Sequence, residues 1–268
     1  MDAIVFIQAI ILGIVEGLTE FLPVSSTGHL ILVGELLGFG GPANSVFEVV
    51  IQLGAILAVV AGFFSRLAHV TRTAGEDPNS RRFLVAVLLA FLPAAVVGFF
   101  AHDFIKAVLF SPWIVSVALI VGGVVLIVVE RYLKEPKVFA VESFSPSLAL
   151  KIGCFQVLSM IPGVSRAGAT IVGALLLGVE RRTAAEFSFF LAIPTMLGAS
   201  ALDLYKSREL LTIDMAGLIA VGFVAAFFSA IVVVNTFVGF VGRHGFAVFG
   251  WYRIAVGGLM LALLSSTG

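Results

Sequence analysis

Apolar residues along this chain form long blocks that are separated by short polar segments. Six blocks come close to the ~20 consecutive apolar residues that a helix needs to cross a bilayer. They lie at about 46–64, 83–101, 113–130, 185–203, 214–234 and 250–266. Two further apolar stretches, 3–38 and 148–178, are interrupted by polar, proline-containing segments at 21–29 and 161–168. Most of their halves are too short to cross, so the pattern predicts an all-α polytopic membrane protein with six transmembrane helices and two re-entrant helix–loop–helix hairpins.

The two interrupted stretches resemble each other at an offset of 140 residues. Gly13 falls on Gly153, and Val24-Ser25 falls on Val164-Ser165. The chain is therefore interpreted as one membrane domain with internal repeats at about 1–135 and 141–268. One hairpin plus three crossings is an odd number, so the second repeat is expected upside down, with both broken loops near the membrane midplane. In the first stretch, Ala9, Gly13 and Gly17 are spaced by four, which lets two helix backbones approach closely.

Composition and charge agree with lipid as the solvent. Of 268 residues, 60% are hydrophobic and 12% are charged, whereas soluble domains carry roughly 25% charged residues. The net charge is zero, so no basic surface suggests a nucleic acid partner. The single cysteine, Cys154, excludes an internal disulfide and a cysteine-based zinc cluster.

The distribution of basic residues predicts an orientation. In the layout above, one side of the membrane holds eleven basic residues and the other holds three. The eleven are Arg66, Arg72, Arg81, Arg82, Arg131, Lys134, Lys137, Lys151, Arg181, Arg182 and Arg243, and the three are Lys106, Lys206 and Arg208. The positive-inside rule places the side with eleven in the cytoplasm, so both termini are expected outside.

Glu16 and Glu20 lie in the first apolar stretch at a spacing that puts both carboxylates on one helix face. Charged groups within membrane helices are costly and usually serve a function. Two neighbouring carboxylates repel each other unless a cation or a proton intervenes, and oxygen ligands suit Mg²⁺ or Ca²⁺. The pair is therefore predicted to bind a divalent cation. The alternative is an exposed helix end at the membrane interface.

The first polar loop carries Ser25, Ser26, Thr27 and His29, just before a helix expected to begin at about Gly28. A helix N-terminus is a natural anion site, and a hydroxyl beside an imidazole forms a nucleophile–base pair. Plain helix capping is the alternative for the hydroxyls.

The second polar loop carries Ser165 and Arg166, with Thr170 one turn later. A guanidinium at mid-membrane depth can grip phosphate oxygens with two parallel hydrogen bonds. An internal salt bridge to Glu16 or Glu20 is the alternative, and both arrangements can alternate. Together the two loops predict a phosphate site, in which Ser25, Thr27, Ser165, Arg166 and Thr170 bind substrate.

The segments Glu16–His29 and Pro162–Arg166 resemble the two signature motifs of the bacterial BacA-type undecaprenyl pyrophosphate phosphatases, which are named for bacitracin resistance. The resemblance extends over nearly the whole chain and includes Phe47–Gly54 and Ser188. It implies hydrolysis of the lipid undecaprenyl pyrophosphate to the monophosphate, which recycles the carrier for cell-wall synthesis. It also implies a bacterial inner-membrane protein with periplasmic termini and a site open to the periplasm. Ala167 departs from the family, where a serine often follows the arginine.

The expected catalytic group consists of Ser26, His29, Arg166 and Glu20. Ser26 is expected to attack phosphorus, with His29 as general base and later acid. Direct attack by His29, and attack by a metal-activated water, remain open. A lipid or anion transporter is the rival function, because inverted repeats with broken helices are also a transport architecture. The oligomeric state stays open, a homodimer included.

Overall fold

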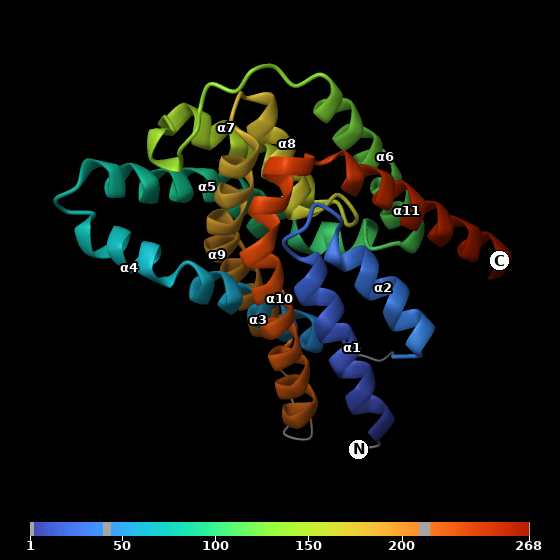
Figure 1. Ribbon diagram of the computed structural model, residues 1–268. Coiled ribbons are helices and arrows are strands. Elements are labelled where there is room, and N and C mark those ends of the chain that lie inside the picture. The colour runs from blue at the N-terminus through green and yellow to red at the C-terminus, as the bar shows by residue number, and fades with distance from the viewer. Residues whose placement is uncertain (1–2, 40–43, 209–214, 268) are drawn as a thin grey trace.

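The computed structural model describes residues 3–39, 44–208 and 215–267, and this part of the chain is built from helices (Figure 1). In chain order they are α1 (Ala3–Thr19), α2 (Ser26–Leu37), α3 (Asn44–Gly62), α4 (Phe64–Thr73), α5 (Pro78–Val108), α6 (Pro112–Arg131), α7 (Pro146–Val157), α8 (Arg166–Leu176), α9 (Arg181–Lys206), α10 (Ala216–His244) and α11 (Ala247–Thr267). Two short 3₁₀ turns, η1 (Val141–Ser143) and η2 (Leu158–Met160), flank α7. Within the described residues, β structure is confined to one isolated bridge between Val138 and Val179.

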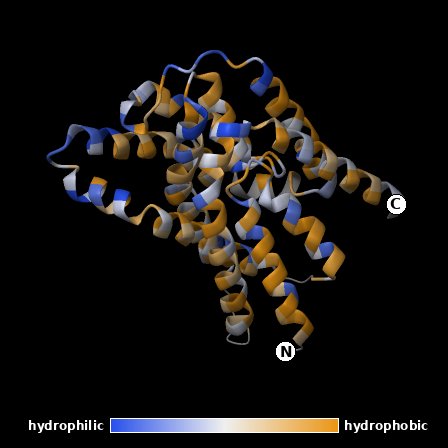
Figure 2. Ribbon diagram, viewed as in Figure 1, coloured by the Kyte–Doolittle hydropathy of each residue, from blue (hydrophilic) through white to orange (hydrophobic). Residues whose placement is uncertain are grey.

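Five helices, α5, α6, α9, α10 and α11, are long and apolar enough to cross a membrane. They correspond to five of the six predicted spans. Figure 2 shows these helices mainly in the hydrophobic colour, with hydrophilic residues gathered on the α4–α5 and α6–α7 connections. Helices α1, α2 and α8, and α7 together with η2, are shorter apolar helices, and they lie on either side of the two predicted breaks.

The sixth predicted span, at about 46–64, differs in the structure. Helix α3 ends at Gly62, and α4 continues after Phe63 at an angle of 72°. Phe63 has φ −110° and ψ 19°, which does not continue the α-helix. The chain that connects the predicted spans at 46–64 and 83–101 is therefore partly helical, over residues 64–73. This stretch is a short helix that packs on α5, and its Arg66 forms ion pairs with Glu142 (2.7 Å) and Glu186 (2.8 Å).

Local sequence explains why some helices begin or end away from their predicted positions. Helix α5 begins at Pro78 rather than at 83, because the Asp77 carboxylate accepts hydrogen bonds from the backbone N–H groups of Asn79 and Ser80. A side-chain cap followed by proline at the first helical position is a strong helix start. Helix α10 runs on to His244, ten residues beyond the predicted end at 234, and stops at Gly245 with φ 69°.

Close packing of α1 against α10 confirms the predicted role of the small residues. A Cβ atom added to Gly13 would lie 2.3 Å from the Gly222 carbonyl oxygen, and one added to Gly17 would lie 2.1 Å from Ser229 Oγ. Only glycine allows these two backbones to approach so closely. Helix α7 packs on α5. Helix α6 packs on α11, and Figure 1 shows this second pair at the right of the molecule.

Candidate functional site

The two polar loops open into one cavity of about 460 Å³. The loop between α1 and α2 and the loop before α8 lie side by side in the centre of Figure 1, and Ser165 Oγ approaches the Leu22 carbonyl oxygen at 3.5 Å. The loops supply the polar end of the cavity with Glu20, Ser25, Ser26, Thr27, Ser165 and Arg166. Helices α5 and α9 supply mostly apolar walls that include Phe91, Ala94, Phe99, Met196, Ala199 and Leu202. The cavity thus joins a polar head to an apolar channel.

Ser26, Glu20 and Arg166 form a hydrogen-bonded chain at the polar end. Ser26 Oγ donates to Glu20 Oε2 at 2.5 Å, and Arg166 Nη2 donates to Glu20 Oε1 at 3.2 Å. The carboxylate therefore has a hydroxyl on one oxygen and a guanidinium on the other. A carboxylate held in this way can take a proton from the serine while the arginine stabilises neighbouring negative charge. The salt bridge between Arg166 and Glu20, which was the alternative to phosphate binding by this arginine, is present.

Contacts with α9 fix the Arg166 guanidinium in place. Nη1 donates to the Ser188 carbonyl oxygen at 2.7 Å and to Ser188 Oγ at 3.2 Å, and Nη2 approaches Met196 Sδ at 3.4 Å. The guanidinium carbon lies 5.6 Å from the centre of the Phe21 ring. Nε is buried without a hydrogen-bond partner, so one of the five N–H donors of this arginine is unsatisfied.

Ser165 and Thr170 serve this arrangement differently from what their sequence positions suggest. Ser165 lines the cavity, but its hydroxyl oxygen accepts a hydrogen bond from the Gly168 backbone N–H at 3.0 Å and caps α8. Thr170, which was predicted to bind substrate, is not among the residues that line the cavity. Its hydroxyl lies 2.9 Å from Ser188 Oγ and 3.0 Å from the Arg166 carbonyl oxygen, so it supports the residues that hold Arg166.

Ser26 and His29, the predicted nucleophile and base, are not hydrogen-bonded to each other in the structure, because each has another partner. His29 Nδ1 lies 2.7 Å from the Ser25 carbonyl oxygen, and Nε2 lies 2.8 Å from the Tyr252 hydroxyl. Both ring nitrogens are therefore occupied away from Ser26. The physical reason is that α2 begins at Ser26 rather than at about Gly28, so His29 reaches back to the residue four positions earlier. The base nearest to Ser26 is Glu20.

Both loops pass through unusual backbone conformations just before their helices. Ser25 has φ 69° and Ser165 has φ 75°, and in the described part of the chain they are the only residues other than glycine with positive φ. Such conformations are rare for residues with a Cβ atom and concentrate at functional sites. Ser25, unlike Ser165, makes no side-chain capping hydrogen bond. The first N–H groups of α2 therefore remain available to an anion in the cavity.

Two further carboxyl groups and Arg166 lie within electrostatic reach of Glu16. Glu16 is buried, 1% exposed, and interacts electrostatically with Glu20, Glu48 and Arg166. Among the described residues, no three His, Cys, Asp or Glu side chains are grouped closely enough to hold a metal ion by themselves. The oxygen donors fit a divalent cation that takes its other ligands from substrate and water, as Mg²⁺ commonly does.

Arg253 is a buried residue of the site that sequence reasoning missed. Its guanidinium donates to five backbone carbonyl oxygens at 2.8–3.2 Å. The acceptors belong to the first loop (Pro23), the second loop (Gly163 and Val164) and α6 (Ala118 and Leu119). One side chain of α11 thus ties both loops together. The sequence does contain an indication of its role. Arg253 and Arg166 are the two basic residues that the predicted topology assigns to neither side of the membrane.

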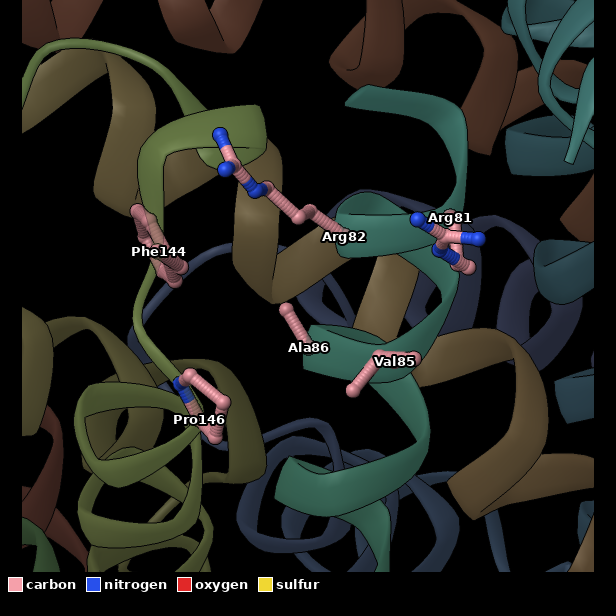
Figure 3. A pocket seen from close by; sticks show the side chains of 6 residues that line it. All are labelled: Arg81, Arg82, Val85, Ala86, Phe144 and Pro146. Atoms are coloured by element: carbon pink, nitrogen blue, oxygen red, sulfur yellow. The ribbon is translucent and has the colours of Figure 1, made fainter. Parts of the chain in front are cut away.

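A smaller cavity of about 140 Å³ lies elsewhere, between the start of α5 and the segment that leads into α7. Figure 3 shows Phe144 and Pro146 facing Arg82 and Ala86 across it. None of the predicted site residues lines this cavity. The larger cavity, by contrast, is lined by six of the predicted site residues: Glu20, Ser25, Ser26, Thr27, Ser165 and Arg166.

Comparison with known proteins agrees with the two motif segments. Residues 9–259 match the family described as "Bacitracin resistance protein BacA". A protein of Parvibaculum lavamentivorans named "Undecaprenyl-diphosphatase" is 58% identical over 260 residues, which cover 97% of each chain. "Undecaprenyl-diphosphatase 2" of Paramagnetospirillum magneticum is 58% identical, covering 96% of this chain and 98% of that protein. "Undecaprenyl-diphosphatase 1" of Agrobacterium fabrum is 56% identical, covering 98% of both. The resemblance noted in the sequence is confirmed.

Proposed function

Because this chain belongs to the bacitracin resistance protein BacA family, we propose that it hydrolyses undecaprenyl pyrophosphate to undecaprenyl phosphate and inorganic phosphate. The observation that carries the proposal is the chain Ser26–Glu20–Arg166 at the polar end of an otherwise apolar cavity. A lipid pyrophosphate has the same two parts, an anionic head and an apolar tail. Such hydrolysis would recycle the lipid carrier of cell-wall synthesis and accounts for the bacitracin resistance in the family description.

In the proposed reaction, Ser26 Oγ attacks the terminal phosphorus, and the bond from that phosphorus to the bridging oxygen breaks. The serine proton passes to Glu20, and undecaprenyl phosphate leaves. Water then displaces the phosphoryl group from Ser26 as inorganic phosphate, and Glu20 returns its proton to Ser26 Oγ. Arg166 and the free N–H groups at the start of α2 hold the non-bridging oxygens, whose charge must be stabilised at the transition state.

Glu16 and Glu20 are proposed to hold a divalent cation, Mg²⁺ or Ca²⁺, near the pyrophosphate. Support comes from the carboxyl groups of Glu16 and Glu20, which lie one helical turn apart, are both buried and interact electrostatically. A bound cation would neutralise phosphate charge and orient the head group. Glu20 would then have two tasks, and its contact with Arg166 would give way as phosphate oxygens enter.

We further propose the complete topology: six crossings, two re-entrant hairpins and an inverted repeat. Helix α3 would form the sixth crossing, and α4, which carries Arg66 and Arg72, would lie at the cytoplasmic face after the bend. The offset of 140 residues relates Ser25 to Ser165, which share the positive φ. It also relates α1 to α7 and α5 to α10, and the packing of α1 on α10 has its counterpart in the packing of α7 on α5.

The cavity is proposed to face the periplasm of an inner-membrane protein whose termini are both periplasmic. Its lining extends to Ile105, Phe110 and Asp203, near the C-terminal ends of α5 and α9. The opposite ends of these helices carry the basic residues predicted to be cytoplasmic. On that side, Arg181 bonds Glu130 at 2.5 Å. The association state of the chain, a homodimer included, enters no step of this proposal.

The direct test is phosphate release from undecaprenyl pyrophosphate by the purified protein in detergent. Ser26→Ala should lower turnover roughly a thousandfold or more, because no other group supplies the attacking oxygen. Ser159→Ala is the matched control, since Ser159 also lines the cavity but bonds only the Gln156 carbonyl oxygen. Its turnover should stay near that of the unaltered protein.

Labelled substrate separates the chemical routes. Acid-stable label on Ser26 is the expected result. Acid-labile label on His29 would replace Ser26 with His29 as nucleophile, and the absence of any covalent label would favour attack by water. A protein that moves the lipid across vesicles without releasing phosphate would instead be a transporter.

A further inference from the structure

We propose that Tyr252 is a positioning residue for this reaction: through His29 it fixes the Ser25 peptide and thereby directs the Ser26 hydroxyl toward Glu20. The inference rests on the proposed function, in which Ser26 attacks the substrate. Tyr252 lies on α11, far from the two sequence motifs, and its hydroxyl is 2.8 Å from His29 Nε2. The two rings are stacked, with centres 5.5 Å apart and planes 3° apart.

The hydrogen-bond partners of His29 define its protonation pattern. The Ser25 carbonyl oxygen, 2.7 Å from Nδ1, can only accept, so Nδ1 carries the proton. In the neutral imidazole Nε2 is then an acceptor, and the Tyr252 hydroxyl must donate to it. A hydroxyl on one side and a carbonyl on the other thus hold the ring in one tautomer and one orientation.

His29 in turn is the main support of the Ser25 peptide. The Ser25 carbonyl oxygen accepts from the His29 backbone N–H at 3.3 Å as well as from Nδ1. Ser25 needs this support because its φ of 69° is unfavourable and its own side chain makes no capping hydrogen bond. Ser26 is the next residue, so the orientation of the Ser25 peptide sets the direction of the Ser26 hydroxyl.

The second loop shows how the same backbone turn is held without an imidazole. Ser165 has φ 75°, and its own hydroxyl caps α8 by accepting from the Gly168 N–H. At the offset of 140 residues, the position of His29 is taken by Ala169. In the loop that carries the proposed nucleophile, the His29–Tyr252 pair supports the turn, whereas a side-chain cap supports it in the second loop. The first N–H groups of α2 are therefore free to bind phosphate.

The test is Tyr252→Phe, which removes the hydroxyl and keeps the ring. We expect kcat to fall about 10-fold to 100-fold, the range for a misplaced reacting group, with KM changed less than about twofold. The rate at which labelled substrate phosphorylates Ser26 should fall by the same factor. Tyr132→Phe is the control, because Tyr132 is an exposed tyrosine at the end of α6.

A double-mutant comparison separates positioning from loss of folding. Because Tyr252 acts through His29, Tyr252→Phe should cost nothing further in a His29→Ala protein. Thermal unfolding of the single variant should stay close to that of the unaltered protein. Three results would overturn the inference: wild-type kcat in Tyr252→Phe, a raised KM with unchanged kcat, or losses that multiply in the double variant. Loss of the serine mechanism itself would show separately, as an active Ser26→Ala protein.

Discussion

Replacing Arg253 tests how strongly the two loops depend on one side chain. Of its five acceptors, the Ala118 and Leu119 carbonyl oxygens lie within α6, where the helix supplies other donors. The Pro23, Gly163 and Val164 carbonyl oxygens receive no backbone hydrogen bond among the described residues. An unsatisfied buried acceptor costs about 1–3 kcal/mol, so three give a ceiling of about 9 kcal/mol. Relaxation of the loops lowers this cost, and we expect Arg253→Met to reduce the free energy of unfolding by about 3–5 kcal/mol.

The assay is thermal unfolding in detergent together with phosphate release. Arg253→Met should unfold at a clearly lower temperature and lose activity, because Ser26 and Arg166 lie on the two loops that separate. The unfolding temperature and activity of Arg253→Lys should lie between those of Arg253→Met and the unaltered protein, since an ammonium group has three donors for five acceptors. Arg243→Met is the control, because Arg243 is exposed on α10 and makes one hydrogen bond, to Gly239 at 3.3 Å. If Arg253→Met and Arg243→Met have the same unfolding temperature and the same rate of phosphate release, Arg253 does not hold the loops together.

Three further predictions follow from the site and the topology. Arg166→Lys keeps the charge but loses the planar fork, so phosphate release should fall about 30-fold to 1,000-fold, nearly as far as in Arg166→Ala; a fully active lysine variant would make Arg166 structural. Glu16→Gln should lower turnover and weaken its dependence on added Mg²⁺ or Ca²⁺ without changing thermal unfolding, and normal metal dependence in this variant would remove Glu16 from the cation site. Single cysteines placed within 68–80 and 132–146 should react only from the cytoplasmic side of sealed vesicles, whereas labelling from the periplasmic side would contradict the proposed orientation.

The sequence predicted the features that depend on short stretches of chain. The two helix breaks and the close approach at Gly13 and Gly17 follow from local polarity and residue size. The Arg166–Glu20 contact joins residues 146 apart, and it was expected only as an alternative, because a buried arginine needs a charged partner. The bend at Phe63 was missed. The residues on both sides of it are apolar, so the hydropathy pattern does not show that the helix changes direction there.

The partner of Ser26 could not be read from spacing. A separation of three places Ser26 and His29 on one face of a regular helix, but the left-handed turn at Ser25 starts α2 at Ser26 and turns the imidazole back toward Ser25. The contacts of Tyr252 and Arg253 with the first loop were equally inaccessible, since they cross more than 220 residues of sequence. Only the position of Arg253 inside a predicted span could have drawn attention to it. Such contacts depend on the packing of α11, which no local pattern records.

The size of the main cavity bears on how the protein obtains its lipid. A volume of about 460 Å³ is typical of a site for a drug-sized molecule and holds a head group with the first isoprene units. The rest of a long polyprenyl chain must stay among the acyl chains of the bilayer. The length of the tail then contributes little to binding. The lipid reaches the site by diffusing in the plane of the membrane, and contacts with its tail are not needed for this. Short-chain analogues that fill the cavity should consequently compete well once they are dissolved in the same membrane.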